Sequence, residues 1–462
     1  MPDLVLTHAY FLQEDPKELQ IMKPYVPLGI LYICSHLREK GLSVDVFDTT
    51  FATRVDLFAF LRSEKPSILG IYANLMTRKN VVEILTVAHD AGWKTIVGGP
   101  EPGAYVEEYL DAGADVVVLG EGELTLEELV PALKSGADLS SIRGVAFKDE
   151  HGMVQQSAPR AQIANLDQQP WPARDAVDVQ RYVDTWRNAH GKGSVSFITA
   201  RGCPYRCRWC SHQVFGQTHR RRNPRLVVDE VEWLLHRYAP DMVWVADDVF
   251  TIHYGWLREY AREMRRRSLR IPFECITRAD RMNDEVVDLL AELGCFRVWI
   301  GSESGSQRIL DSMERGVTVE EVQRGVALAR SRNIASGMFL MWGYEGEELQ
   351  DIEATIEHVK RTDPDVFFTT LSYPIKGTPY YRDVSHQLLQ IKPWAVSSDR
   401  DLQISGRHSK RFYEFADRLL HDEVELARLE RRGPVNGDGA ALRQRIAASR
   451  AGLRASCVEV DA

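Results

Sequence analysis

Cysteine is scarce in this chain of 462 residues, which contains only seven. Four of them, Cys34, Cys275, Cys295 and Cys457, are scattered without a close partner in the sequence, so a disulfide-rich scaffold is excluded. No apolar run approaches the roughly 20 residues that a membrane-spanning helix needs. The N-terminal Met-Pro-Asp-Leu-Val-Leu also lacks the basic and apolar segments of a signal peptide. We therefore expect a cytoplasmic protein without a membrane span.

Basic residues are also fewer than acidic ones. The 66 acidic residues outnumber the 57 basic ones and give a formal net charge of -9. A protein whose main ligand is a nucleic-acid backbone usually has the opposite balance, so no nucleic-acid partner is expected. The length favours two or three domains, and an apolar content of 44% is enough to bury their cores.

Residues 1–140 alternate short apolar strands with helical patterns, which predicts a doubly wound parallel sheet of the Rossmann-like kind. The expected strands are Asp3–Thr7, Ser43–Asp48, Ile68–Tyr72, Thr95–Gly98 and Val116–Leu119. Ligands of such sheets bind beyond the carboxyl ends of the strands. No Gly-x-Gly-x-x-Gly motif follows the first strand, which disfavours a nicotinamide dinucleotide. A receiver-type phosphorylation domain shares this topology, but it would need an acidic pair where His8-Ala-Tyr-Phe stands.

The rest of the chain predicts a linker, a second α/β domain and a helical tail. Residues 141–193 form the linker, with a hairpin made by Val145–Lys148 and Met153–Gln156. Residues 194–382 contain six expected strands, Ser194–Thr199, Met242–Ala246, Phe273–Thr277, Arg297–Gly301, Ser336–Trp342 and Val366–Ser372. Six successive βα units predict a partial (β/α)6 TIM-type barrel with its chemistry at the C-terminal ends of the strands. Residues 383–462 are expected to be helical.

Three cysteines, Cys203, Cys207 and Cys210, follow the first of these six strands within Ala200-Arg-Gly-Cys-Pro-Tyr-Arg-Cys-Arg-Trp-Cys-Ser-His212. A cubane iron–sulfur cluster is normally held by four thiolates, so a loop with three leaves one iron free to hold a small molecule. A structural zinc site is the alternative, but it usually needs four ligands in paired spacing. His212 stands only two residues after Cys210, which is a cramped position for a fourth ligand.

The spacing Cys-x3-Cys-x2-Cys, with the aromatic Trp209 before the last cysteine, resembles the signature of the radical S-adenosylmethionine (radical SAM) enzymes. The resemblance implies that the three cysteines are catalytic metal ligands of a [4Fe-4S] cluster. Its open iron would chelate the amino and carboxylate groups of S-adenosylmethionine, and reductive cleavage would release a 5′-deoxyadenosyl radical. The resemblance also implies an external electron donor such as flavodoxin or ferredoxin.

Polar residues follow three of the later strands, where the family binds S-adenosylmethionine. By the resemblance, Asp247 and Asp248 hold the methionyl ammonium, which suits a charge-assisted hydrogen bond to a carboxylate. Glu303 would accept the ribose hydroxyls, and Ser304 adjoins it in Gly301-Ser-Glu-Ser-Gly-Ser306. Arg278 could meet a carboxylate. A solvated helix N-terminus remains the alternative for the aspartates, and a structural salt bridge remains the alternative for Arg278.

Two further segments resemble the family. Gly343-Tyr-Glu-Gly-Glu-Glu348 departs at two places from the family's Gly-x-Pro-Gly-Glu-Thr. Tyr373-Pro-Ile-Lys-Gly-Thr-Pro-Tyr380 closes the barrel region. Tyr373 could reach a substrate, but a core tyrosine is at least an equal alternative.

The N-terminal half resembles the cobalamin-binding branch of this family, and the likeness extends from about residue 20 to 380. It implies that the corrin lies between the two domains, with its nucleotide tail in the open sheet. The motif residues that carry this expectation are Gly98, Gly99, Pro100, Gly120, Glu121 and Gly122. The Asp-x-His-x-x-Gly motif, which supplies a histidine to cobalt in other cobalamin proteins, is absent. The loop with Asn74, Leu75 and Met76 would then face the lower side of the corrin, with Leu75 leaving cobalt weakly ligated.

The chemistry most often implied by this branch is methylation of an unreactive carbon of a small-molecule substrate via methylcobalamin. Cyclisation, rearrangement or deoxygenation, with cobalamin or after loss of cobalamin binding, remain alternatives. An RNA methylthiotransferase would want a second cysteine trio in the N-terminal half, which holds only Cys34. A non-enzymatic iron–sulfur or B12 sensor would not need Asp247, Glu303 and a complete barrel together.

Overall fold

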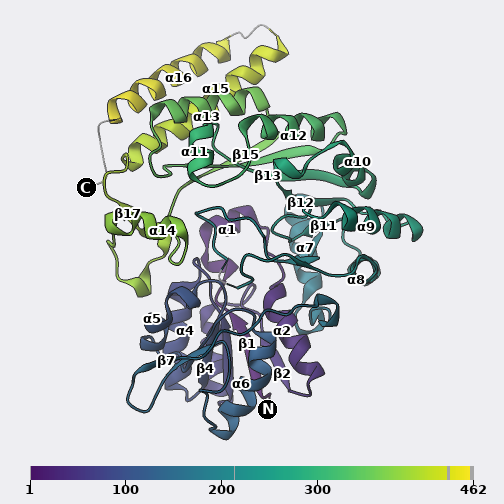
Figure 1. Ribbon diagram of the computed structural model, residues 1–462, viewed down its shortest axis with the longest axis vertical. Coiled ribbons are helices and arrows are strands. Elements are labelled where there is room, and N and C mark those ends of the chain that lie inside the picture. The colour runs from purple at the N-terminus through teal and green to yellow at the C-terminus, as the bar shows by residue number, and fades with distance from the viewer. Residues whose placement is uncertain (1, 213, 434–436, 458–462) are drawn as a thin grey trace. The chain divides into compact units, whose positions relative to one another are not determined.

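The computed structural model describes residues 2–212, 214–433 and 437–457 (Figure 1). They divide into two compact units. The first unit contains residues 1–204, 211–246 and 392–401, and the second contains residues 205–210, 247–391 and 402–462. Among the described residues, no helix is both long and apolar enough to cross a membrane.

A seven-stranded sheet forms the centre of the first unit, in the order β2-β1-β3-β4-β5-β6-β7. The strands are β1 Leu4–His8, β2 Val44–Phe47, β3 Ile68–Tyr72, β4 Lys94–Gly98, β5 Val116–Val118, β6 Val145–Lys148 and β7 Val154–Gln156. The first five are parallel, and β6 and β7 extend the sheet as an antiparallel hairpin. The order 2-1-3-4-5 of the parallel strands is that of flavodoxin-like doubly wound folds.

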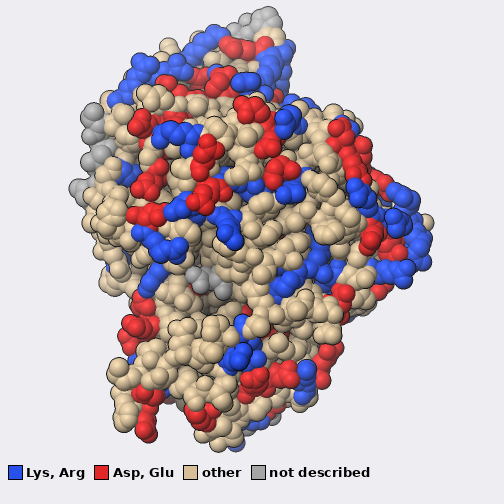
Figure 2. All heavy atoms as spheres, in the orientation of Figure 1, with Lys and Arg blue, Asp and Glu red and all other residues tan. Residues whose placement is uncertain are grey.

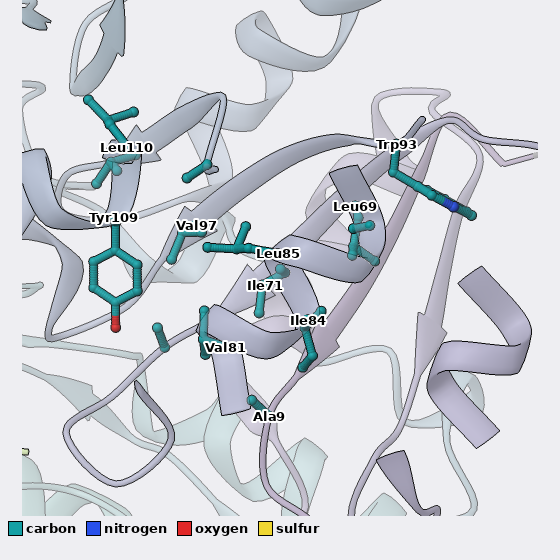
Figure 3. Packing of buried hydrophobic residues seen from close by; sticks show 14 of the residues in the cluster. Ala9, Leu69, Ile71, Val81, Ile84, Leu85, Trp93, Val97, Tyr109 and Leu110 are labelled. Carbon is teal, nitrogen blue, oxygen red and sulfur yellow. The ribbon is translucent and has the colours of Figure 1, made fainter. Parts of the chain in front are cut away.

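Two hydrophobic clusters cover the two faces of this sheet, because successive strand residues point to opposite sides. One face carries Leu69, Ile71 and Val97, and Figure 3 shows them packed beside Ile84 and Leu85 of a flanking helix. The other face is covered by a separate cluster of buried residues that includes Leu4, Leu6, Ile68, Ile96, Val116, Leu126 and Leu129. Burial of both faces explains why these strands are almost continuously apolar.

The first unit also contains eight α-helices and four short strands among its described residues. The helices are α1 Pro16–Ile21, α2 Leu28–Glu39, α3 Arg54–Ser63, α4 Arg78–Asp90, α5 Val106–Asp111, α6 Glu123–Ser135, α7 Val179–His190 and α8 Pro224–Tyr238. The strands are β8 Ser194–Phe197, β9 Ala200–Arg201, β10 Arg220–Arg221 and β11 Met242–Val245. Strands β8 and β11 pair in parallel, and β9 and β10 pair antiparallel.

Helix α7 lies within the segment expected to be a linker, and the sequence already contained its pattern. Asp178 caps the helix by accepting a hydrogen bond from the Arg181 backbone. Val179, Tyr182 and Trp186 are buried at helical spacing, with Val183 beside them. Pro170 and Pro172 precede the helix and favour an extended chain, so the expected linker did not include this amphipathic stripe.

The second unit contains four parallel strands, β12 Phe273–Thr277, β13 Cys295–Glu303, β14 Ala335–Trp342 and β15 Val366–Leu371. Its described α-helices are α9 Tyr254–Arg266, α10 Asp284–Leu293, α11 Gln307–Ser312, α12 Val319–Ser331, α13 Leu349–Thr362, α14 Pro379–Val384, α15 Lys410–Arg432 and α16 Gly437–Ser456. The short strands β16 Leu388–Leu389 and β17 Gln403–Ile404 pair antiparallel. Helices α15 and α16 lie side by side (Figure 1).

The predicted fold class is confirmed, with a doubly wound sheet, alternating β and α elements in the second half, and a helical C-terminal region. Strand β13 is longer than expected, because it continues past a register shift between Gly301 and Glu303 and still pairs with β14. Figure 2 shows basic and acidic side chains interspersed over the visible face.

Candidate functional site

The loops after β3 and β4 contact each other in the first unit. The Ala73 backbone donates a hydrogen bond of 2.8 Å to the Gly98 carbonyl. Gly99 has a φ of +121°, and a Cβ atom on it would stand 2.3 Å from the Ala73 carbonyl oxygen. Glycine is therefore required at position 99 by the packing of these two loops. Gly98 and Pro100 flank it and are half-buried.

A tight turn shapes the loop that follows β3. The Asn74 side-chain oxygen accepts hydrogen bonds from the backbones of Met76, at 2.9 Å, and Thr77, at 3.2 Å. This turn holds Met76 outward with 58% of its surface exposed, and Leu75 is half-buried. The loop therefore presents two apolar side chains at the carboxyl end of the sheet, and no histidine stands in it.

A buried arginine, Arg78, fastens this loop to a segment from much later in the chain. Its guanidinium lies 2.5 Å from a Glu101 carboxylate oxygen and 2.8 Å from one of Asp399. Tyr105 donates a hydrogen bond of 2.5 Å to Asp399, and the Arg78 guanidinium lies 5.3 Å from the ring centre of Trp394. Residues Lys392–Asp401, which we call the strap, are thereby held against the first unit.

The loop after β5 carries carboxylates that are used within the protein. Glu121 accepts a hydrogen bond of 2.7 Å from Arg201, and Glu123 accepts one of 2.6 Å from the same guanidinium. Arg220 binds the second oxygen of Glu121 at 2.7 Å. Because Arg201 stands two residues before Cys203, these ion pairs position the start of the cysteine loop.

Glycine is favoured at two positions of the same loop, by backbone conformation at one and by close packing at the other. Gly120 has a φ of +86°, a conformation that favours glycine. A Cβ atom on Gly122 would stand 2.8 Å from the Ile33 side chain, so this glycine permits close packing of α6 against α2. Neither role requires a ligand.

In the second unit, two arginines point at the thiol of Cys207. The Nη1 atom of Arg315 lies 3.7 Å from Cys207 Sγ, and that of Arg278 lies 3.9 Å from it. Both guanidinium groups are almost fully buried, and Arg278 lies 3.5 Å above the centre of the Tyr205 ring. Guanidinium groups at this distance can donate hydrogen bonds to the sulfur and balance the negative charge of a metal site. No motif in the sequence singles out Arg315, which lies 108 residues from Cys207.

Glu303 lies at the end of β13 in a left-handed conformation with a φ of +62°. Its carboxylate is 5% exposed and stands 3.7 Å from Arg315 Nε. Burial raises the pKa of Glu303, and the positive charges of Arg315 and Arg278 oppose that rise. Gly301 completes the arrangement by accepting a hydrogen bond of 2.9 Å from Arg315.

Glu303 also lines a cavity of about 250 Å³ within the second unit. The other lining residues are mostly apolar, namely Trp209, Phe339, Leu340, Met341, Phe368, Thr369, Thr370, Tyr373 and Ile375. A single carboxylate in an apolar pocket is suited to orient a ligand that has hydroxyl groups and a large nonpolar part. Trp209 and Tyr373, both singled out from the sequence, are thus brought together with Glu303.

The remaining predicted residues differ in their surroundings. Asp247 is buried with 1% of its surface exposed, whereas Asp248 is exposed. Ser304 is buried, and its hydroxyl lies 3.2 Å from that of Thr355, which indicates a structural role. Cys210 donates its backbone N–H to the Cys207 carbonyl at 3.1 Å.

The described part of the chain contains no group of three or more His, Cys, Asp and Glu side chains placed to hold a metal ion. Cys203 belongs to the first unit, whereas Cys207 and Cys210 belong to the second. The assignment of the three cysteines to one cluster therefore rests on their spacing, on the charge around Cys207 and on related proteins.

Two family models match the chain. Residues 197–359 match the Radical SAM superfamily, and residues 21–130 match the B12 binding domain. The first match contains all three cysteines and Glu303, and the second contains the loops after β3, β4 and β5.

Relatives cover most of the chain. The uncharacterized methyltransferase PH0819 of Pyrococcus horikoshii is 30% identical over 398 residues, covering 83% of each chain. Cytidylyl-2-hydroxyethylphosphonate methyltransferase of Streptomyces wedmorensis is 26% identical and covers 78% of each chain. The anaerobic magnesium-protoporphyrin IX monomethyl ester cyclase of Rubrivivax gelatinosus is 26% identical, covering 75% of this chain and 64% of that protein.

Solved structures share the fold. The structure of TsrM, a radical S-adenosylmethionine methyltransferase from Kitasatospora setae with cobalamin and a [4Fe-4S] cluster bound, has a TM-score of 0.69. It is 21% identical and covers 87% of this chain and 81% of its own. OxsB, a cobalamin-dependent S-adenosylmethionine radical enzyme with aqua-cobalamin bound, has a TM-score of 0.75 at 17% identity, covering 99% of this chain and 72% of its own.

Proposed function

Because this chain belongs to the cobalamin-binding branch of the radical SAM enzymes, we propose that it methylates an unreactive carbon of a small molecule. Its cofactors are a [4Fe-4S] cluster, S-adenosylmethionine and cobalamin. When bound, these groups supply a carbon radical and a transferable methyl group, which are steps that side chains alone cannot perform. The observation that carries the proposal is the union of both cofactor domains in a chain that is 30% identical to a methyltransferase over most of its length.

Cys203, Cys207 and Cys210 are proposed to hold the cluster, with Arg278 and Arg315 compensating its charge. The support is the approach of both guanidinium groups to Cys207 Sγ within 4 Å. Arg278 donates hydrogen bonds to Asp280 and the Arg315 carbonyl and points at this thiol, so we assign it to the cluster rather than to a substrate carboxylate.

Glu303 is proposed to bind the ribose hydroxyls of S-adenosylmethionine, and Asp247 its ammonium group. The carboxylate of Glu303 lines the cavity together with Trp209, so it can accept hydrogen bonds from a ligand seated there. The mostly apolar remainder of the wall lowers the local polarity, which strengthens those bonds. Asp248 is exposed and is the weaker candidate of the aspartate pair.

The loop with Asn74, Leu75 and Met76 is proposed to face the lower side of the corrin. Its support is the absence of a histidine ligand in the loop and the outward position of Met76. Gly98 to Pro100 and Gly120 to Gly122 are proposed to border the nucleotide tail. The tight packing at Gly99 and Gly122 supports this proposal, because it sets the course of the two loops that would border the tail.

The partners that we propose are a small-molecule substrate and an external electron donor such as flavodoxin or ferredoxin. All seven cysteines are free of disulfides, which agrees with a reducing, cytoplasmic location. A cyclisation reaction is the second candidate, since magnesium-protoporphyrin cyclases of two further bacteria also match over about four fifths of this chain, covering 80% of it in each case.

Deuterated S-adenosylmethionine tests the proposed methylation directly. The protein is purified without oxygen, reconstituted with iron, sulfide and hydroxocobalamin, reduced, and given S-adenosylmethionine with a deuterated methyl group. We expect the extracted corrin to carry the deuterated methyl group and 5′-deoxyadenosine to form. A corrin that never acquires the label, with 5′-deoxyadenosine still formed, would contradict methylation and favour cyclisation.

Two cysteine variants control this experiment. Cys207→Ala should abolish 5′-deoxyadenosine formation, because it removes a cluster ligand. Cys457→Ala removes a thiol outside the motif and should leave both readouts at the wild-type level. Cleavage that persists in Cys207→Ala would refute the assigned cluster.

A further inference from the structure

Three aromatic rings lie stacked across neighbouring strands of the second unit. Trp299 of β13 stacks on Phe339 of β14 with ring centroids 5.2 Å apart and planes 15° apart. It also stacks on Phe368 of β15 at 5.6 Å and 12°. The planes of Phe339 and Phe368 differ by 22°. We call these three rings the aromatic floor.

The floor depends on a glycine and on a buried carboxylate. Trp299 pairs with Gly337 in the register of β13 and β14, and a Cβ atom on Gly337 would stand 2.2 Å from the indole. The missing side chain therefore lets the indole lie flat. Glu274 then fixes its rotation by accepting a hydrogen bond of 2.9 Å from the indole Nε1. Such fixed rings form a preorganised surface.

One ring of the floor is exposed, and the other two, Trp299 and Phe339, are half-buried. Phe368 is 55% exposed, whereas its neighbour Phe367 points to the other side of β15 and stacks on His421 of α15 at 4.7 Å. Phe339 and Phe368 line the same cavity as Glu303, so two rings of the floor and the carboxylate border one space, and Trp299 stacks on both rings. A ring that served only the core would be covered by other side chains.

The cavity has the size and polarity for a flat ring system. Its volume of about 250 Å³ exceeds the roughly 150 Å³ of an apolar cavity that holds benzene. Apart from Glu303, its polar wall groups are uncharged, namely hydroxyls such as those of Thr370 and Tyr373 and the indole N–H of Trp209. Two cavity-lining rings with nearly parallel planes favour planar unsaturated ligands over saturated ones, because offset stacking adds to the burial of apolar area.

We propose that the substrate accepting the methyl group carries a planar unsaturated ring, which binds on the aromatic floor of Trp299, Phe339 and Phe368. This inference rests on the proposed function, because it assumes an acceptor that shares the cavity with S-adenosylmethionine. Glu303 binds the ribose hydroxyl groups of S-adenosylmethionine, and the three rings contact the flat face of the acceptor.

Two matched probes test the ring preference. Binding of a naphthalene alcohol and of its fully saturated decalin counterpart to the reconstituted holoenzyme is measured by calorimetry in the presence of S-adenosylmethionine. Both probes are uncharged and have one hydroxyl group, so they differ mainly in planarity and π-electrons. We expect the naphthalene probe to bind at least roughly threefold more tightly. Equal binding of the two probes, or no binding of either, would overturn the inference.

Neighbouring phenylalanines of β15 provide the variant and its control. Phe368→Leu should remove most of the preference for the naphthalene probe, since it replaces the exposed ring of the floor by an alkyl group. Phe367→Leu alters the adjacent residue on the opposite side and should keep the preference at its wild-type ratio. A preference that survives Phe368→Leu, or one that Phe367→Leu destroys equally, would place the probe elsewhere and refute the floor.

Methyl labelling of the corrin is recorded on the same samples, so that the two proposals can fail separately. Labelled corrin together with equal probe binding would overturn the ring inference alone. Unlabelled corrin would contradict the methylation reaction itself, whichever probe binds better.

Discussion

Arg315 links two of the proposed cofactor contacts, since its guanidinium lies 3.7 Å from both Cys207 Sγ and a Glu303 oxygen. A positive charge at this distance stabilises the more negative, reduced state of a cluster. We predict that Arg315→Met lowers the reduction potential of the cluster by roughly 60 mV, a tenfold change in the one-electron equilibrium. Arg315→Lys keeps the charge and should retain most of the potential. An EPR-monitored redox titration measures both, and an unchanged potential in the Met variant would remove Arg315 from the cluster environment.

Glu347 makes stability depend on pH. Burial raises the pKa of its carboxyl to about 8 from the ordinary 4.5, and one oxygen has no hydrogen-bond partner among the described residues. The folded state therefore keeps a proton that the unfolded chain loses. This contribution to stability is complete below pH 4.5 and is lost as the pH rises through about 8.

Glu347→Gln tests this sign. Glutamine cannot ionise, and its oxygen can still accept the hydrogen bond that the Gly343 backbone donates to Glu347. Between pH 6 and pH 9 we expect the variant to lose less free energy of unfolding than the wild type, by about 1 kcal/mol or more. Denaturant unfolding at both pH values measures the difference. Glu345→Gln, at an exposed neighbour, is the control, and identical pH dependence in all three proteins would contradict the assignment.

At the scale of elements, we predict that replacement of glycine by alanine changes the free energy of unfolding in opposite directions in β14 and in α2. Gly337→Ala would drive a methyl group into the Trp299 indole and should cost about 2 kcal/mol of unfolding free energy. Gly29→Ala meets no atom within 4 Å and should stabilise the protein by about 0.5 kcal/mol, because alanine favours helix. Thermal or denaturant unfolding measures both, and equal effects would contradict the close approach at Gly337.

The strap formed by Lys392–Asp401 predicts a coupling between distant segments of the chain. Asp399→Asn removes a buried charge that faces Arg78, so we expect the strap and the Asn74–Thr77 turn to open more easily, by roughly 3 kcal/mol. Hydrogen exchange of these backbone amides is the measurement. Asp401→Asn, which breaks a partly exposed pair with Lys392, should change exchange by less than about 1 kcal/mol. Equal effects of the two variants would mean that Arg78 does not hold the strap.

Sequence patterns identified elements and motifs well where the signal is local. The strands Ile68–Tyr72 and Phe273–Thr277 have the bounds that the sequence pattern predicts. The chain also showed the cysteine spacing and the carboxylate after β13. Helix α7 differs from the expected linker, because its buried stripe follows a proline-containing extended segment and is only about two turns long in the sequence.

At the scale of the whole molecule, partners that are far apart in the sequence could not be predicted. Arg315 lies 108 residues from Cys207, and Asp399 lies 321 residues from Arg78, so no spacing rule connects them. The same holds for Glu121, whose carboxylate binds Arg201 and Arg220, 80 and 99 residues further along the chain. Only the folded arrangement reveals which charges neutralise one another.

The central claim is that one chain holds both a cubane cluster and a corrin. Its most direct test is an iron determination and visible spectrum of the protein after oxygen-free reconstitution with iron, sulfide and hydroxocobalamin, followed by desalting. The account predicts about four irons and one retained corrin per chain. A protein that keeps no iron would contradict the reading of Cys203, Cys207 and Cys210, and a cluster without corrin would contradict the cobalamin-dependent reaction.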